Sequence, residues 1–286
     1  MDGATRPYLR ACLRALYSRV SGPPIWRGPL LRHVKGQKIR LEGFNNLTKS
    51  LSFNIYDICY ARSHESQIEY LEYIDEAYNS QRLRDIIEEV TQIIDAKLLH
   101  MSTQDYDPRG ASVTAMVSED HSSPVPETKI TGHLDKSHIT AHTYPEHDPA
   151  TGLASFRVDI DVSTCGMISP LHALHHLIRS FDSDVVVLDY RVRGFTRDSS
   201  GRKHYIDHDI TSIQDYISEE VLREYRAYDI NVVSEKLFHT KMRKKLLAMD
   251  DYLFGPEAEG LKGRKLSEVK RLLETEVQEI FESQNL

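Results

Sequence analysis

The sequence predicts an α+β protein, in which an antiparallel sheet carries helices packed on one face. Residues 154–162 alternate strictly between apolar and polar side chains, as a half-buried antiparallel strand does. Residues 64–78 and 266–281 instead carry apolar side chains at the spacing of an amphipathic helix. Helical and strand patterns follow one another without strict alternation, which argues against a parallel β-α-β arrangement.

The first half predicts two helices, a strand and a linker. Apolar residues at helical spacing indicate helices over 64–78 and 82–99. The apolar stripe of the first helix is predicted to consist of Ile68, Leu71, Ile74 and Tyr78. Residues 111–118 have a strand pattern, and two prolines within residues 119–128 exclude regular structure and predict a linker.

The second half predicts strands, a hairpin and two helices. The segment 133–146 supplies a strand that is predicted to end at Pro145, and the alternating strand over 154–162 follows it. Ser169 followed by Pro170 is typical of the start of a helix, with a cap residue and then proline in the first turn. The last elements are a hairpin formed by residues 184–195 and 203–210, and a closing helix over 266–281.

Composition restricts the class of protein. The 286 residues, 40% of them hydrophobic, suffice for one large domain or two small ones and for a sizeable core. A net charge of -7 argues against a nucleic-acid-binding protein, which usually has a basic face. Since no apolar run approaches the ~20 residues of a membrane span, no membrane partner is expected. The three cysteines, Cys12, Cys59 and Cys165, form no disulfide framework and suggest a reducing, cytoplasmic setting.

The N-terminal 36 residues differ from the rest. They contain seven Arg or Lys residues against one acid, Asp2, and no apolar core of a signal peptide. A disordered extension is the preferred interpretation, and a transit peptide is the alternative. We therefore expect a basic extension over 1–36 and one folded domain over 37–286.

The segment "HLDKSHITAHTYPE", residues 133–146, concentrates groups that transfer protons. Ser137 lacks the Gly-x-Ser-x-Gly turn of a hydrolase nucleophile. His138 and His142 lack the His-Glu-x-x-His spacing of a helical zinc site. On a strand, His138, Thr140, His142 and Tyr144 would share one face. Residue types alone therefore leave partly exposed surface histidines as the simplest interpretation.

Several sequence blocks resemble one known family. They are "LEGFNNLTKSLSFNIYDICYA" (41–61), "QDYDPRGASVT" (104–114), "HLDKSHITAHTYPE" (133–146), "VSTCG" (162–166), "DYRVRGFTRD" (189–198) and "FHTKM" (238–242). In these blocks the chain resembles S-adenosylmethionine decarboxylase proenzymes of the long, gammaproteobacterial type, over roughly residues 37–286. The resemblance implies a sandwich fold of that family and pyruvoyl-dependent decarboxylation of S-adenosyl-L-methionine, for spermidine synthesis.

The resemblance also implies self-cleavage between Lys136 and Ser137, giving a β chain of residues 1–136 and an α chain of 137–286. Ser137 becomes the covalent pyruvoyl group, which forms the Schiff base with substrate. His142 is implied as the proton acceptor for this processing. Cys165 is implied as the proton donor for decarboxylation, a role that suits a thiol because it is mostly protonated near neutrality yet gives up its proton readily.

Substrate contacts are less sharply defined. Glu146 is implied to bind the ribose hydroxyls of S-adenosylmethionine. Aromatic rings are needed against the purine and the sulfonium, and Phe44, Phe53 and Tyr56 are the candidates. Five residues of extended chain span about 16 Å. His142 therefore reaches Ser137 only if the segment bends sharply at the serine; otherwise the base comes from elsewhere, for example from a partner chain.

Assembly and ions follow from the resemblance alone. It implies association of cleaved protomers, four α with four β chains, and Mg²⁺ as a possible activator, with no metal ligands that the sequence identifies. The rival hypothesis is a processing-dead paralogue that acts as a scaffold or metal-binding protein through its 14 histidines.

Overall fold

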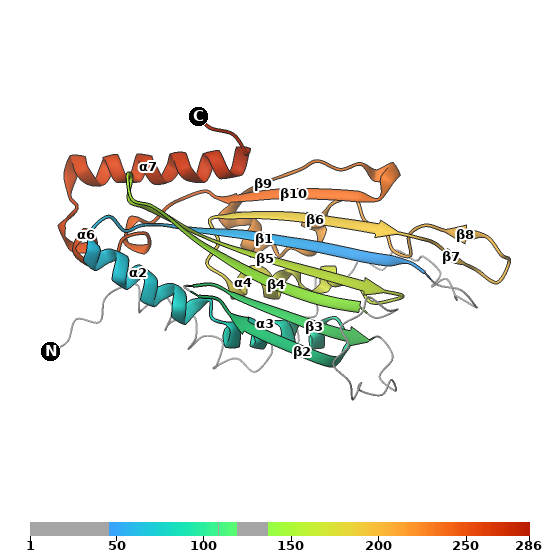
Figure 1. Cartoon of the computed structure of the whole chain (residues 1–286). Helices are drawn as coiled ribbons and strands as arrows, with labels where there is room; N and C mark the ends of the chain where they lie inside the picture. The colour runs from blue at the N-terminus through green and yellow to red at the C-terminus, as the bar shows by residue number, and fades with distance from the viewer. Residues whose placement is uncertain (1–45, 108, 119–136) are drawn as a thin grey trace.

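The computed structural model describes residues 46–107, 109–118 and 137–286 (Figure 1). The predicted N-terminal extension and the predicted linker lie outside the described residues. So do Lys136 and Phe44, two residues that the sequence singled out.

One eight-stranded antiparallel sheet forms the centre of the molecule, with strand order β2-β3-β4-β5-β1-β6-β10-β9 (Figure 1). The first of the described strands, β1, therefore lies in the middle of the sheet, between β5 and β6. The bounds are β1 Thr48–Tyr60, β2 Lys97–Asp105, β3 Ala111–Ser118, β4 Ser137–Asp148, β5 Leu153–Cys165, β6 Val185–Arg193, β9 Tyr225–Asp229 and β10 Leu237–Lys244. A separate two-stranded ribbon is formed by β7 (Thr196–Arg197) and β8 (Lys203–His204).

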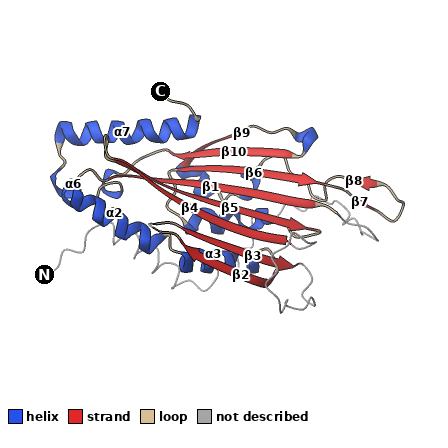
Figure 2. Cartoon of the chain, in the orientation of Figure 1, coloured by secondary structure: helices blue, strands red, loops and turns tan. Residues whose placement is uncertain are grey.

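Most helices cover one face of this sheet and enclose the main core (Figure 2). They are α2 (His64–Ala77), α3 (Ser80–Ile93), α4 (Leu174–Ser180), α5 (Glu219–Glu224) and the 3-10 turns η1 (Pro170–Ala173) and η2 (Ile213–Tyr216). Alternate residues of each strand point into this core, as in Leu51, Phe53 and Ile55 of β1, which are fully buried. The predicted α+β class with an antiparallel sheet is confirmed.

The C-terminal helix α7 (Gly263–Glu282) lies on the opposite face of the sheet (Figure 1). Its buried residues Val269, Leu273 and Val277 join a second apolar cluster with Ile58 and Tyr60, near the end of β1. The short elements η3 (Val233–Glu235), η4 (Met249–Asp251) and α6 (Gly255–Gly260) complete the chain. The rest of that face is polar, because the outward residues of β4, β5 and β1 are hydrophilic. Among the described elements, the long helices therefore pack on one face of the sheet, except α7, which packs on the other.

The alternating strand and the helices over 64–78 and 266–281 are confirmed, whereas the run over 82–99 is helical only as far as Ile93 and enters strand β2 at Lys97. The buried side of α2 also differs from the prediction. Ile68 is 44% exposed, whereas Tyr70 is buried against Phe254, with ring centroids 5.8 Å apart. Tyr78 stacks on Phe156 at 4.1 Å. Aromatic rings therefore set the orientation of this helix; the predicted stripe was right for Ile74 and Tyr78, but it included Ile68 and omitted Tyr70.

Three other expectations need correction. Pro145 does not close its strand: β4 continues to Asp148, because β3 pairs with β4 only as far as His142 and the proline lies where that edge is open. The expected hairpin shrinks to β7 and β8, since β6 pairs instead with β1 and β10. Strands β1, β2, β9 and β10 had no predicted counterpart. None of the helices in the described part of the chain is both long and apolar enough to cross a membrane.

Candidate active site

Ser137 and Cys165 meet at one end of the sheet. Ser137 is the first residue of β4 and is 5% exposed. Its neighbour His138 pairs with Ser163 of β5, which places Ser137 beside the last two residues of that strand. The backbone N–H of Cys165 donates a hydrogen bond to Ser137 Oγ at 3.1 Å. The structure therefore brings together the predicted pyruvoyl precursor and the predicted proton donor.

A turn after β5 fixes the position of Cys165. The buried Thr164 hydroxyl donates to the carbonyl of Ile168 at 3.0 Å. Gly166 follows with φ of 70°, a left-handed conformation that favours glycine, and its N–H donates to the carbonyl of Leu47 at 3.1 Å. Cys165 is a free cysteine and its side chain is partly exposed. The Thr-Cys-Gly sequence thus ends the strand in a turn whose thiol remains accessible.

His142 lies on the other face of the sheet from Ser137. Residues five apart on a strand point to opposite faces and are about 16 Å apart along it. The described strand does not bend to shorten this distance, because β4 pairs with β5 without interruption from His138 to Asp148. On the polar face, Tyr106 Oη lies 3.4 Å from His142 Nδ1. Within one protomer the structure does not bring His142 to Ser137.

A row of polar and aromatic side chains continues along β4 beyond His142. Glu146 accepts a hydrogen bond from Ser155 Oγ at 3.1 Å, and the Arg157 guanidinium lies 4.3 Å from the ring centre of Tyr144. Tyr56 of β1 pairs with Arg157 and lies on the same face. This row offers a carboxylate and exposed aromatic surface in one line, as a nucleoside would require.

Burial and charge shape this row. Burial raises the pKa of Asp159, although Arg157 Nη2 donates to its carboxylate at 2.7 Å and opposes the effect. Asp159 is the register partner of His142 on β5. Phe53, one of the aromatic candidates, is fully buried in the main core against Phe181 and is not available to a ligand, whereas Tyr56 is.

Sequence reasoning missed Lys49, which is 1% exposed and donates to the carbonyl of Gly166 at 2.8 Å. The signal was present, because Lys49 occupies a core-facing position of β1 in phase with Leu51 and Phe53. A lysine at such a position is rarely buried unless it is paired.

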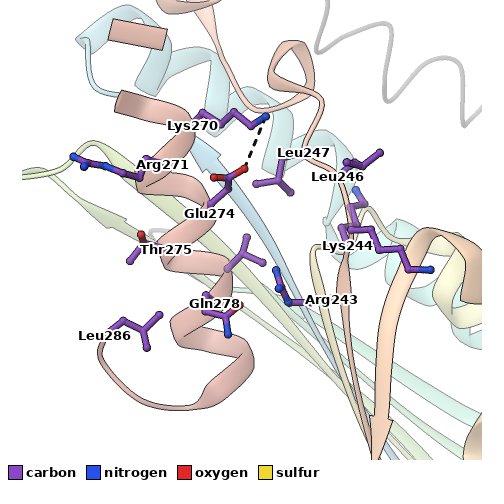
Figure 3. Close-up of a pocket in the computed structure, with 12 residues that line it drawn as sticks. Arg243, Lys244, Leu246, Leu247, Lys270, Arg271, Glu274, Thr275, Gln278 and Leu286 are labelled. Carbon is purple, nitrogen blue, oxygen red and sulfur yellow. Dashed lines mark ion pairs between the residues drawn. The ribbon is translucent and has the colours of Figure 1, made fainter. Parts of the chain in front are cut away.

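Two further features lie away from Ser137. A cavity of about 410 Å³ between α7 and residues 243–247 is lined by five basic side chains together with apolar and polar ones, and Glu274 pairs with Lys270 at 3.9 Å (Figure 3). It contains none of the predicted site residues. Across the described residues, no three His, Cys, Asp or Glu side chains gather into a group that could hold a metal ion. No magnesium ligand is therefore assigned.

Fold and site together define an α+β protein in which a buried serine hydroxyl accepts a hydrogen bond from the backbone N–H of a cysteine at the end of an antiparallel sheet. The chain belongs to the S-adenosylmethionine decarboxylase family. The family profile described as S-adenosylmethionine decarboxylase matches residues 68–194, a range that contains Ser137, His142, Glu146 and Cys165.

Similar proteins cover most of the chain. A protein of Alkalilimnicola ehrlichii named S-adenosylmethionine decarboxylase proenzyme is 54% identical over 264 residues, which are 88% of this chain and 96% of that protein. One of the same name from Chromohalobacter salexigens is 55% identical over 260 residues, 87% of this chain and 98% of its own. Among solved structures, the adenosylmethionine decarboxylase of Aquifex aeolicus matches 59% of this chain and 100% of its own, with 16% identity and a TM-score of 0.31.

Proposed function

We propose that the chain is a proenzyme that cleaves itself between Lys136 and Ser137 and then decarboxylates S-adenosyl-L-methionine. The observation that carries the proposal is the hydrogen bond from the Cys165 N–H to Ser137 Oγ, 3.1 Å long. It places the candidate nucleophile against the backbone of Cys165, the residue whose thiol is the candidate acid, in a chain whose relatives are named as proenzymes of this decarboxylase. Cleavage would give a β chain of residues 1–136 and an α chain of 137–286.

The residues present fit the conversion of Ser137 into a pyruvoyl group. Ser137 Oγ attacks the Lys136 carbonyl, the amide nitrogen leaves, and an ester replaces the peptide bond. Removal of the Ser137 α-proton breaks the ester C–O bond, and Lys136 departs as the C-terminal carboxylate of the β chain. Water then hydrolyses the remaining dehydroalanine to a ketone and releases ammonia. The Cys165 N–H assists the first step, since a donor at 3.1 Å orients Ser137 Oγ and eases removal of its proton before the attack.

A pyruvoyl group made from Ser137 would supply an electron-withdrawing carbonyl able to accept the electron pair left by the departing CO2. Cys165 then delivers a proton to the former α-carbon of the substrate. Glu146 accepts hydrogen bonds from the ribose hydroxyls, and Tyr56 and Phe44 are the aromatic candidates for the purine. The products are CO2 and decarboxylated S-adenosylmethionine, an aminopropyl donor for spermidine synthesis.

The base for α-proton removal is His142 of a neighbouring protomer in this proposal. Its support is geometric, because His142 and Ser137 of one chain lie on opposite faces of an uninterrupted strand. The proposed assembly contains four α and four β chains in the cytoplasm. Mg²⁺ is proposed as an activator only, and no step above uses it; the test is the CO2 release of EDTA-dialysed protein, which should rise when Mg²⁺ is restored.

Intact-mass measurement of the purified protein tests the proposal, together with release of labelled CO2 from carboxyl-labelled S-adenosylmethionine. We expect two chains that divide at residue 137, the α chain without a free amino terminus, and CO2 release. Ser137→Ala protein should remain one chain and release no CO2. A wild-type chain that stays whole and inactive would overturn the proposal in favour of a scaffold.

A further inference from the structure

A buried ammonium group lies directly beneath the turn that carries Cys165. Lys49 is on the core face of β1, and its side chain is 1% exposed. A charge in such surroundings is costly unless it is paired and hydrogen-bonded. Lys49 Nζ meets that need with two partners, Asp207 Oδ2 at 2.7 Å and the carbonyl oxygen of Gly166 at 2.8 Å.

The Asp207 carboxylate is itself held from its other side. His208 Nδ1 donates to Asp207 Oδ1 at 2.8 Å, and Tyr190 Oη donates to His208 Nε2 at 3.1 Å. Although burial alone would raise it, the pKa of Asp207 is lowered by the hydrogen bonds from His208 and Lys49. Burial, and next the Asp207 charge, raise the pKa of Tyr190, so its hydroxyl stays a donor. The four side chains form one connected network that keeps Asp207 ionised opposite the lysine.

The network ends on the backbone that controls both reacting groups. Gly166 directly follows Cys165, and the Cys165 N–H donates to Ser137 Oγ at 3.1 Å. The Gly166 carbonyl lies in the peptide plane that follows Gly166, so a charged donor on it restricts the turn immediately after Cys165 and, through that turn, the position of the Cys165 backbone.

We propose that Lys49, held by Asp207, is a positioning residue for both steps of the reaction, an inference that rests on the proposed function. Lys49 holds the turn that aims the Cys165 N–H at Ser137 Oγ for self-cleavage, and the same turn carries the Cys165 thiol for protonation. It contacts no substrate. Its loss should therefore lower the rate of cleavage and the accuracy of protonation, while KM stays near that of the wild type.

The competing explanation is that the ion pair only anchors the loop around Asp207 to the sheet. A second ion pair in the chain provides a matched control for that explanation. Lys244 Nζ pairs with the buried Asp182 at 2.8 Å at the other end of the sheet, near residues 184 and 243. Lys244→Met should cost stability as Lys49→Met does, but should leave the chemistry of the folded protein unchanged.

The experiment follows newly synthesised full-length chains in a cell-free system and measures the fraction cleaved over time. Mature protein then gives kcat, KM and the number of turnovers before the enzyme inactivates itself by misplaced protonation. A displacement of about 1 Å can reduce a rate roughly 100-fold, and we expect a loss of that order in cleavage for Lys49→Met. Asp207→Asn, which keeps the side-chain shape, should show a smaller loss of the same kind. Both variants should inactivate after fewer turnovers, and Lys244→Met should match the wild type.

The outcomes separate the two proposals. If wild type cleaves and releases CO2 while folded Lys49→Met and Asp207→Asn proteins match it in cleavage rate and in turnovers before inactivation, the positioning role is wrong and the proposed function stands. If Lys49→Met does not fold, the isosteric Asp207→Asn variant decides by the same two readouts. A wild-type chain that neither cleaves nor decarboxylates overturns both proposals.

Discussion

Individual residues at the end of β4 show how strand geometry divides the chemistry. Ser137 points to the helix-covered face with the Cys165 amide on its oxygen, and His142 points to the polar face beside Tyr106. The sequence could predict Ser137, His142 and Cys165, because the blocks 133–146 and 162–166 contain them. It could not predict Lys49 and Asp207 as partners, since 158 positions separate them in the chain.

Replacing His142, the proposed base, should stop self-cleavage at the ester between Lys136 and Ser137. His142→Ala protein is expected to accumulate uncleaved chains in which Ser137 Oγ has attacked Lys136 but the α-proton remains. Hydroxylamine, which attacks esters and not amides, should cut those chains at residue 137, as a gel will show. Ser137→Ala is the control and should resist the reagent; full self-cleavage of His142→Ala alone would exclude His142 as the base.

Replacing Cys165, the proposed proton donor, should affect decarboxylation more than self-cleavage. Cys165→Ala keeps its backbone N–H, so we expect at least partial self-cleavage, because the bond to Ser137 Oγ comes from the backbone. The cleaved fraction should turn over slowly and inactivate early, measured as CO2 released per active site. Wild-type decarboxylation by cleaved Cys165→Ala protein would show that another group supplies the proton.

The Asp207–Lys49 pair should give stability a defined pH dependence. The pKa of Asp207 is lowered in the folded chain from an unfolded value of about 3.9. Its contribution is therefore fully present above the unfolded value and is lost as pH falls through the folded one. Urea midpoints of wild type and Asp207→Asn should differ most at pH 7 and converge toward pH 3. A constant difference across that range would contradict this assignment.

How well each helix or strand could be predicted from the sequence depended on what that element packs against. The alternation of β5 was clear because one of its faces is buried and the other polar. The predicted run over 82–99 concealed the start of β2 at Lys97, since helix and strand are hard to separate in a short apolar run. Proline at an open edge, as in β4, cannot be distinguished by sequence from proline that ends a strand.

Helix α7 should stabilise the fold without influencing the chemistry. Leu273 is fully buried against the end of β1 that carries Ile58 and Tyr60, whereas Cys165 pairs with Thr48 at the opposite end. Leu273→Ala should cost about 2–4 kcal/mol in free energy of unfolding by leaving a cavity. Its folded fraction should still cleave at the wild-type rate in a time course.

An exposed leucine provides the control for this substitution. Leu246 is 86% exposed, so Leu246→Ala should change the free energy of unfolding by less than about 0.5 kcal/mol. A similar loss in both variants, measured by urea unfolding, would mean that α7 is not held by its buried face.

The molecule as a whole has one helix-covered face and one largely polar face, with predicted site residues on both. Only a second copy can bring His142 to Ser137 if the strand keeps its geometry. Coexpression of Ser137→Ala and His142→Ala chains with different tags tests this arrangement. Assemblies purified through both tags should contain cleaved His142→Ala chains and release CO2, although each variant alone does not. Mixed assemblies that remain uncleaved would place the whole site in one chain.

The central position of β1 has a consequence for the life of the cleaved protein. After cleavage β1 belongs to the β chain, yet it lies between β5 and β6 of the α chain and pairs with β5 along 13 residues. The two products would therefore be interwoven and separate only when the sheet opens. Refolding from urea would then require an encounter between two molecules, where the uncleaved Ser137→Ala chain needs none. Folding before cleavage would therefore be easier to repeat than folding after it. The idea is supported if the refolding yield falls on dilution for the mature protein and not for the Ser137→Ala protein.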